Sequence, residues 1–109
     1  MIRISFENPI LSEEELKEIT EDDLCDCGKD KVFEGFNQFF VLLATYTYYE
    51  QENNKEAAAY ASYLLSWYLF VPLTPPGSEI LALQYANKAY ELNSMQKYAD
   101  HIEFVKNEN

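Results

Sequence analysis

Glycine and proline, the residues that most often interrupt helices and strands, are scarce in this chain of 109 residues, which has three Gly and four Pro. So few of them allow few turns, which argues against a fold of many short strands and favours a handful of long helices. The length suits one domain with one core, and hydrophobic residues make up 48% of the chain. We therefore expect a single all-α domain over residues 1–109.

Cysteine and histidine are also few. Cys25 and Cys27 are separated by one residue, so a disulfide between them would be strained and would close almost no loop. Met1–Glu7 has neither a continuous apolar run nor a small-residue cleavage site, so we expect no signal peptide and a cytoplasmic protein with free thiols. A zinc site needs four ligands, and the only histidine, His101, is far along the chain from both cysteines. We expect no metal and no other cofactor.

Basic residues are outnumbered, with eight Lys and Arg against 19 Asp and Glu and a net charge of −11. Glu7–Glu34 alone contains eleven acids and three lysines, a net charge of −8. Binding to phosphates needs Lys and Arg, so we expect neither direct nucleic-acid binding nor attraction to an anionic membrane surface. A basic protein is the favoured partner. The alternative is a solvated acidic face that only keeps the protein in solution.

A long charge-free stretch, Ala57–Ser78, raises the question of a membrane span. Its apolar part is barely long enough for a bilayer, three prolines end it, and Ala, Ser and Tyr outnumber Leu and Ile in it. Lys and Arg do not cluster at either flank. We therefore expect a buried helix of a small bundle.

Glycine-rich phosphate loops are absent, and the remaining catalytic motifs are incomplete. His101 is flanked on its helix by Asp100 and Glu103, which predicts a surface histidine rather than the partner of a nucleophilic cysteine. Acids on an exposed face lack the raised pKa that a general acid needs. We therefore expect that the protein is not an enzyme.

One loop resembles a calcium site in its spacing. With Gly28 at the sixth position of such a loop, Asp23 falls on the first position and Glu34 on the twelfth. The third and fifth positions, however, are Cys25 and Cys27, which are soft ligands that do not suit calcium. The match is best read as chance within an acidic segment.

Local signals predict about five helices after a short extended arm at Met1–Phe6. Ser12 and Glu15 form a capping box for the first helix, with Leu11 stapled onto Leu16 and an end within Glu21–Gly28. The other helices are expected at about Lys31–Gln51 with Asp30 as cap, Lys55–Phe70 with Asn54 as cap, Glu79–Leu92 with Ser78 as cap, and Met95–Lys106.

The helix expected at Lys55–Phe70 is apolar nearly all round, which is typical of a central helix. One face carries Ala58, Ala61, Leu64, Leu65 and Tyr68, and a second face carries Tyr60, Tyr63 and Trp67. Aromatic stripes at helical spacing are mostly core, and the alternative is a pocket or a binding groove. In the last helix, helical spacing places Met95, Tyr98, Ile102 and Val105 on the inward face.

The stretch Leu81–Asn93, with Ala82 and Ala89 seven residues apart around Tyr85, resembles the second helix of a tetratricopeptide or Sel-type repeat. The resemblance covers about residues 58–93 and includes Val71-Pro72, a pair found in Sel-type loops. Four features depart from it: the loop is about five residues too long, Ser94 replaces the closing proline, Leu65 replaces a small residue at the eighth position, and no second copy is present. The resemblance implies a helical hairpin that binds protein and brings no catalytic residues.

In overall type, the chain is similar to the small acidic immunity proteins with which bacteria neutralise basic toxins, often nucleases. We therefore predict a protein-binding inhibitor. The alternative is a helical adaptor or assembly subunit that uses its aromatic helices to bind a partner, or to form a homodimer. The predicted partner-binding face consists of Glu13, Glu14, Glu18, Glu21, Asp22, Asp23 and Asp26.

Overall fold

The fold is an all-α bundle, as predicted. The structure is a computed structural model that describes residues 11–21, 32–71 and 77–107. Within those ranges it contains no strand, and its helices are α1 (Glu13–Glu18), α3 (Val32–Gln51), α4 (Lys55–Phe70), α5 (Ser78–Leu92) and α6 (Gln96–Asn107). The predicted arm at Met1–Phe6, the two cysteines, the calcium-like loop around them and the Asp30 cap lie outside the described residues.

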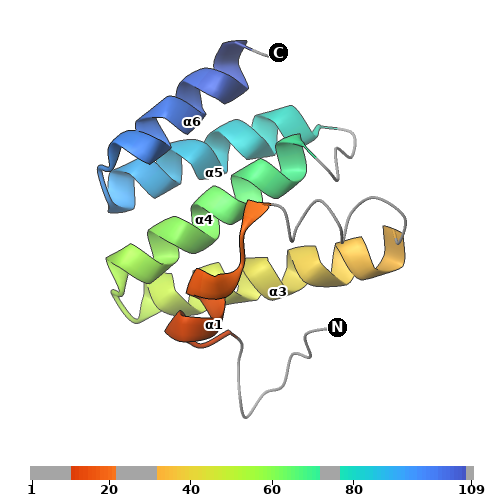
Figure 1. The fold of residues 1–109 in the computed structure, drawn as a ribbon, viewed down its shortest axis with the longest axis vertical. Helices are drawn as coiled ribbons and strands as arrows, with labels where there is room; N and C mark the ends of the chain where they lie inside the picture. The colour runs from red at the N-terminus through yellow and green to blue at the C-terminus, as the bar shows by residue number, and fades with distance from the viewer. Residues whose placement is uncertain (1–10, 22–31, 72–76, 108–109) are drawn as a thin grey trace.

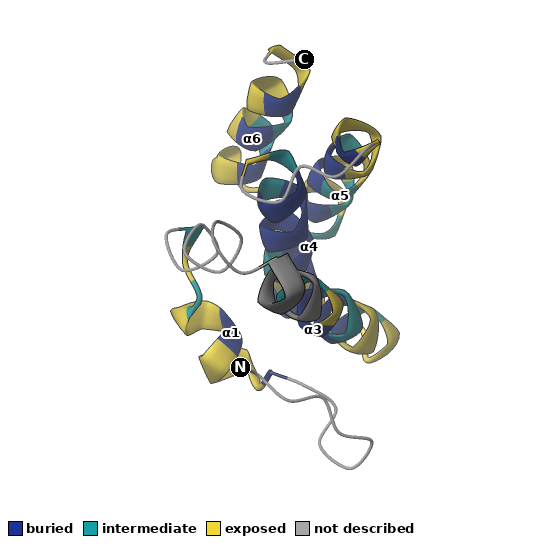
Figure 2. Cartoon of the chain, turned by 90° about the vertical axis from the view of Figure 1, so that its right-hand side faces the viewer, coloured by how far each residue is buried: buried dark blue, intermediate teal, exposed yellow. Residues whose placement is uncertain are grey.

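Helix α4 is central, which confirms the prediction from its apolar surface. It packs against α3, α5 and α1, while α6 packs mainly against α5 (Figure 1) and reaches α4 through His101. The turned view in Figure 2 shows α4 almost entirely buried among its neighbours. The five residues predicted for its inward face are fully buried, Tyr63 is buried, and Tyr60 and Trp67 are half-buried. None of the described helices combines the length and apolar character that crossing a membrane requires.

Small residues let α4 and α5 approach closely. Ala82, Ala86 and Ala89 of α5 are buried, and two serines of α4 are buried opposite them. A buried hydroxyl needs a partner, and both serines find one on the α5 backbone. Ser62 donates to the Tyr85 carbonyl at 2.7 Å and Ser66 donates to the Ala82 carbonyl at 2.6 Å. The two helices are therefore joined by hydrogen bonds as well as by packing.

The helix starts follow local sequence signals in two of three cases. The Ser12–Glu15 capping box of α1 is present, and the Asn54 side chain accepts the Ala57 N–H to cap α4. The prediction that Ser78 caps α5 is wrong: Gly77 is the N-cap, with φ of 81°, and Ser78 is the first residue of the helix. A positive φ is readily available to glycine, so the turn forms there without a side-chain cap.

Two predicted features near the chain ends are corrected. Helix α1 ends at Glu18, earlier than expected, because Ile19 is extended. Met95 was expected to point inward but is 46% exposed and precedes α6. The buried face of α6 consists of Tyr98, His101 and Val105, so the helix is rotated relative to the predicted face.

Candidate functional site

The acidic segment 11–21 is fastened to the core by tyrosine hydroxyl groups. Tyr49 of α3 donates to the Leu11 carbonyl at 2.8 Å, and Tyr60 of α4 donates to the Ile19 carbonyl at 2.6 Å. Between these bonds, the Leu16 side chain is inserted against the core and keeps only 1% of its surface exposed. The segment is therefore held at both ends and in its middle, which fixes the side of α1 from which its acidic side chains extend.

Glu21, one of the predicted partner-binding residues, is used within the molecule. The Tyr63 hydroxyl donates to its carboxylate at 2.5 Å, and the Lys97 ammonium lies 3.6 Å from the same oxygen. Burial by itself would raise the pKa of Glu21, but the hydrogen bond from Tyr63 and the charge of Lys97 outweigh it, and the pKa lies below its usual value. Lys97 also lies over the Tyr63 ring, 4.8 Å from its centre. Glu21 therefore links the end of the acidic segment to α4 and α6.

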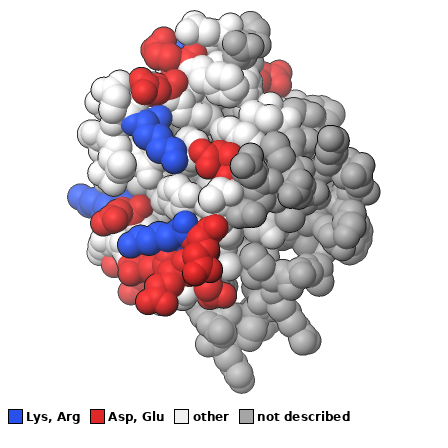
Figure 3. All heavy atoms as spheres, viewed as in Figure 1, with Lys and Arg blue, Asp and Glu red and all other residues white. Residues whose placement is uncertain are grey.

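The other predicted acids that the structure describes lie on the surface. Glu13, Glu14 and Glu18 are exposed, and Glu13 accepts a hydrogen bond from the Asn54 side chain. Neither Glu14 nor Glu18 forms a side-chain hydrogen bond or an ion pair with any residue in the described ranges. Figure 3 shows acidic side chains gathered at the lower left, in the region where Figure 1 places α1. Asp22, Asp23 and Asp26 lie outside the described residues.

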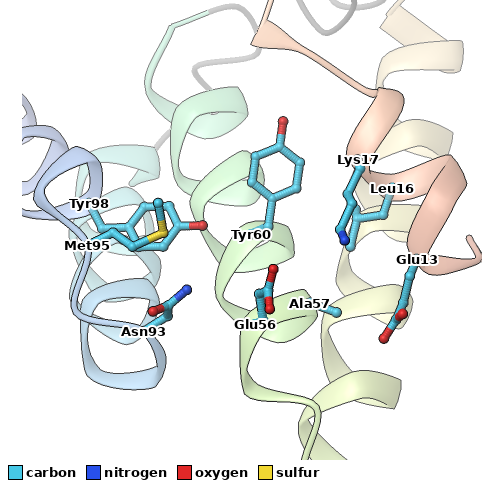
Figure 4. A pocket seen from close by; sticks show the side chains of 9 residues that line it. All are labelled: Glu13, Leu16, Lys17, Glu56, Ala57, Tyr60, Asn93, Met95 and Tyr98. Atoms are coloured by element: carbon cyan, nitrogen blue, oxygen red, sulfur yellow. The ribbon is translucent and has the colours of Figure 1, made fainter.

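A pocket of about 300 Å³ opens beside α1, above the surface of α4 (Figure 4). Helix α1 forms one wall, the α5–α6 turn and the start of α6 form the other, and α4 is the floor. Its lining residues are Glu13, Leu16, Lys17, Glu56, Ala57, Tyr60, Asn93, Met95 and Tyr98. Sequence reasoning missed this pocket because three segments far apart in the chain build it. Met95, an apolar side chain at the end of a turn, lines this pocket and is 46% exposed, which is unusual enough to draw attention to the site.

His101 was predicted to be a surface residue, and this is wrong: it is 6% exposed. Its Nε2 lies 2.8 Å from the Ser66 Oγ, and its ring packs edge-on against Tyr63. Asp100 and Glu103 remain exposed on the same helix, so charged neighbours in sequence do not report which way the imidazole points.

The arrangement of Ser66 and His101 does not suit nucleophilic catalysis. The single Ser66 proton is donated to the Ala82 carbonyl, so the Ser66 oxygen accepts from His101 Nε2–H. A catalytic histidine would instead accept the serine proton. Burial lowers the pKa of His101 to about 4, so its ring is neutral near pH 7. The pair satisfies two buried polar groups where α4, α5 and α6 meet.

A second, more polar groove of about 480 Å³ lies between α3 and α5. The Tyr46 and Tyr85 rings meet edge-on at 5.8 Å between their centres, and Lys88 forms an ion pair with Glu50 at 3.2 Å. Tyr46 also donates to Glu50 at 2.6 Å. Glu50 therefore serves as the common partner of Tyr46 and Lys88 in this groove.

Among the described residues, no group of three His, Cys, Asp or Glu is arranged to hold a metal ion. No protein-family model matches this chain. No curated protein and no solved structure matches it either.

Proposed function

We propose that this protein is a non-catalytic binding protein that recognises a basic protein, in the manner of an immunity-type inhibitor. Its contact region is the acidic surface formed by Glu13, Glu14 and Glu18 of α1 and Glu56 at the start of α4. All four side chains are exposed. The observation that carries the proposal is the fastening of segment 11–21 by Tyr49, Leu16 and Tyr60.

The attachment of segment 11–21 to the core matters because binding affinity falls with the conformational entropy that is lost on binding. A loose acidic tail would lose conformational freedom on binding, whereas a fixed helix has already lost it during folding. Charges held in place also produce a directed field, which speeds encounter with a partner of opposite charge. Glu14 and Glu18 suit this role, because neither carboxylate is neutralised by a lysine in the described part of the chain.

Two further observations support a binding role over a catalytic one. The Ser66–His101 pair is buried, and its serine proton points away from the histidine. Glu14 and Glu18 of α1 are exposed and lack the apolar surroundings of a general acid.

The test compares Glu14→Gln/Glu18→Gln with the matched control Glu79→Gln/Glu103→Gln. Both double variants remove two negative charges from exposed helix positions, and the control positions lie on α5 and α6. Each protein is immobilised, and basic proteins are captured from an extract of the source organism. The best-retained protein is then purified, and its association rate is measured from about 50 mM to about 500 mM NaCl.

We expect the α1 variant to associate about tenfold more slowly than wild type at low salt, and the control to resemble wild type. The difference should shrink as salt is added, because screening weakens steering. Equal rates for all three proteins at every salt concentration would contradict the proposal.

The second candidate is a helical adaptor that binds through its aromatic helices, favoured by the groove between α3 and α5. That groove presents the Tyr46 and Tyr85 rings with Leu43. An adaptor of this kind would bind through apolar contact, so its affinity would change little with salt, and Tyr85→Ala would weaken it while Glu14→Gln/Glu18→Gln would not.

A further inference from the structure

The pocket between α1 and the start of α6 combines an apolar surface with acceptors for hydrogen bonds. Leu16, Ala57 and Met95 supply aliphatic and thioether surface from three segments of the chain. Glu13 and Glu56 place a carboxylate on each of two helices at its margin, as Figure 4 shows. A volume of about 300 Å³ is at the small end for ligand pockets and suits a side chain better than a large cofactor.

The Tyr98 hydroxyl is a polar group directed into this space. Tyr98 keeps only 3% of its surface exposed, and its ring packs against Tyr63. Figure 4 shows its hydroxyl pointing from the α6 side toward Tyr60, across the pocket. It forms no hydrogen bond with any residue in the described ranges, whereas the hydroxyls of Tyr49, Tyr60 and Tyr63 each have a partner. No buried side-chain oxygen or nitrogen in the described residues lacks a partner, so the Tyr98 oxygen opens onto the pocket and is free to bond to a ligand there.

The chemistry of the lining selects the ligand. Two carboxylates, the Asn93 side-chain oxygen and the Tyr98 oxygen are all acceptors, and burial raises the pKa of Tyr98 to about 12, so the phenol is uncharged near pH 7. A guanidinium group carries five N–H donors in a planar fork that can reach several acceptors at once. Its three-carbon stem would lie on Met95, which is 46% exposed, since long cationic side chains bury their methylene groups along apolar surface.

We propose that this pocket receives one arginine side chain of the basic partner and anchors it on the acidic surface. The inference rests on the proposed function and deepens it. Glu14 and Glu18 act at a distance on the rate of encounter, whereas Glu56, Tyr98 and Met95 hold the bound arginine and govern the rate of dissociation. Lys17 lies in the same lining and opposes an incoming cation.

The pocket is tested directly with a small probe, N-acetyl-arginine N-methylamide, by nuclear magnetic resonance titration of the whole chain at low salt. The lysine analogue and the uncharged norleucine analogue are the comparison ligands. We expect the arginine probe to saturate with a dissociation constant in about the millimolar range, as suits one side chain. Its shifts should concentrate on Leu16, Ala57, Met95 and Tyr98.

Four variants make the assignment specific. Glu56→Gln should weaken the probe about tenfold, Tyr98→Phe about threefold and Met95→Ala about threefold, while Lys17→Gln should tighten binding about threefold. Glu79→Gln, on α5, is the matched control for the lost charge and should bind as wild type does. Thermal unfolding of each variant establishes that it remains folded.

Several results would overturn the pocket. They are the absence of saturable binding, shifts scattered over the acidic surface, equal binding of the norleucine analogue, or unchanged affinity in both Glu56→Gln and Tyr98→Phe. Tighter binding of the lysine analogue would overturn the choice of arginine.

The failure of this inference is distinguishable from failure of the proposed function. Suppose that Glu14→Gln/Glu18→Gln slows association with the captured protein, while Glu56→Gln and Tyr98→Phe leave its dissociation rate unchanged. The proposed acidic contact surface is then supported, and the arginine pocket is rejected. If the arginine probe binds in the pocket but Glu14→Gln/Glu18→Gln associates with the captured protein at the wild-type rate, the pocket is supported and the steering role of α1 is rejected.

Discussion

Two contacts of α4 differ in the way that they are built. Against α5, α4 is joined by a long interface of fully buried alanine, serine and leucine side chains. Against α1, the contact is short, with one deeply inserted leucine. Hydrogen bonds on either side of α1 come from Tyr60 and Tyr63 of α4 and from Tyr49 of the neighbouring α3. The first depends on close packing, and the second depends on a few polar bonds.

The difference between the two contacts indicates which surface can carry binding residues without loss of stability. Changes in a closely packed interface cost several kcal/mol, so the α4–α5 contact has little freedom to vary. The α1 contact uses its inner side for attachment and leaves its outer side free, so acidic side chains there can vary with little effect on folding.

The largest effect is expected in the core. Leu65→Ala removes a fully buried side chain of α4 and should lower the free energy of unfolding by about 2–5 kcal/mol, because it removes apolar contacts and leaves a cavity. Urea denaturation at neutral pH measures it. A loss below about 1 kcal/mol would mean that the core can collapse around the gap, and the contrast with α1 would weaken.

An effect almost as large is expected from acid, acting through His101. Its pKa is lowered from 6.5 to about 4 in the folded protein, so the folded state favours the neutral ring and the unfolded chain takes up the proton first. Stability from this group is fully present above pH 6.5 and is lost as the pH falls from 6.5 through 4. Between neutral pH and pH 5 the loss should be about 2 kcal/mol.

The acid effect is isolated by comparing wild type with His101→Gln, which keeps an N–H donor for Ser66 but does not titrate. The pH dependence of the free energy of unfolding should be smaller by about 2 kcal/mol in the variant over the same range. Parallel curves for the two proteins would show that other groups dominate the acid sensitivity.

A smaller and more local effect is expected where α1 is attached. Tyr49→Phe removes the hydrogen bond to the Leu11 carbonyl and should cost about 1 kcal/mol. Amide hydrogen exchange should speed up within α1 while the amides of α4 change less. Tyr48→Phe is the matched control, because the neighbouring Tyr48 is exposed and should have no such effect. Uniform loss of protection in both helices would show that α1 and α4 unfold together.

The smallest effect is expected on the outer side of α1. Glu14→Gln/Glu18→Gln should change the free energy of unfolding by less than about 0.5 kcal/mol, since both side chains are exposed and unpaired among the described residues. Thermal unfolding measures this. A loss above about 1 kcal/mol would mean that these acids support the fold, and the separation between attachment and recognition would fail.

Much of the fold was predictable because its signals are local. The bounds of α4, Lys55–Phe70, agree with the prediction, and the capping box of Ser12 and Glu15 is present in α1. Both depend on residues within one or two turns, where hydrogen bonds between neighbours decide the backbone. The central place of α4 also followed from its sequence, because a helix without a polar face has to be surrounded.

The candidate site was only partly predictable. Glu13, Glu14 and Glu18 were expected on the surface and lie there, but Glu21 was grouped with them and instead bonds to Tyr63 and lies beside Lys97. Glu56 and Tyr98 were not considered for binding, since nothing in the local sequence places α1 beside the start of α6. The pocket depends on contacts between residues about forty to eighty positions apart, as Glu13, Glu56 and Met95 show.

The sequence by itself determined the all-α fold, the caps of α1 and α4, the core helix and the acidic character of α1, because composition and short-range spacing suffice for these. The tertiary structure decided which face of α6 is buried, and with it the burial of His101 and the exposure of Met95. It also decided that the hydroxyls of Tyr49, Tyr60 and Tyr63 attach the acidic segment, while that of Tyr98 opens onto a pocket. The physical reason is that an amphipathic stripe limits a helix's rotation only loosely, and the long-range hydrogen bonds that fix it, such as Ser66 with His101, are absent until the helices pack together.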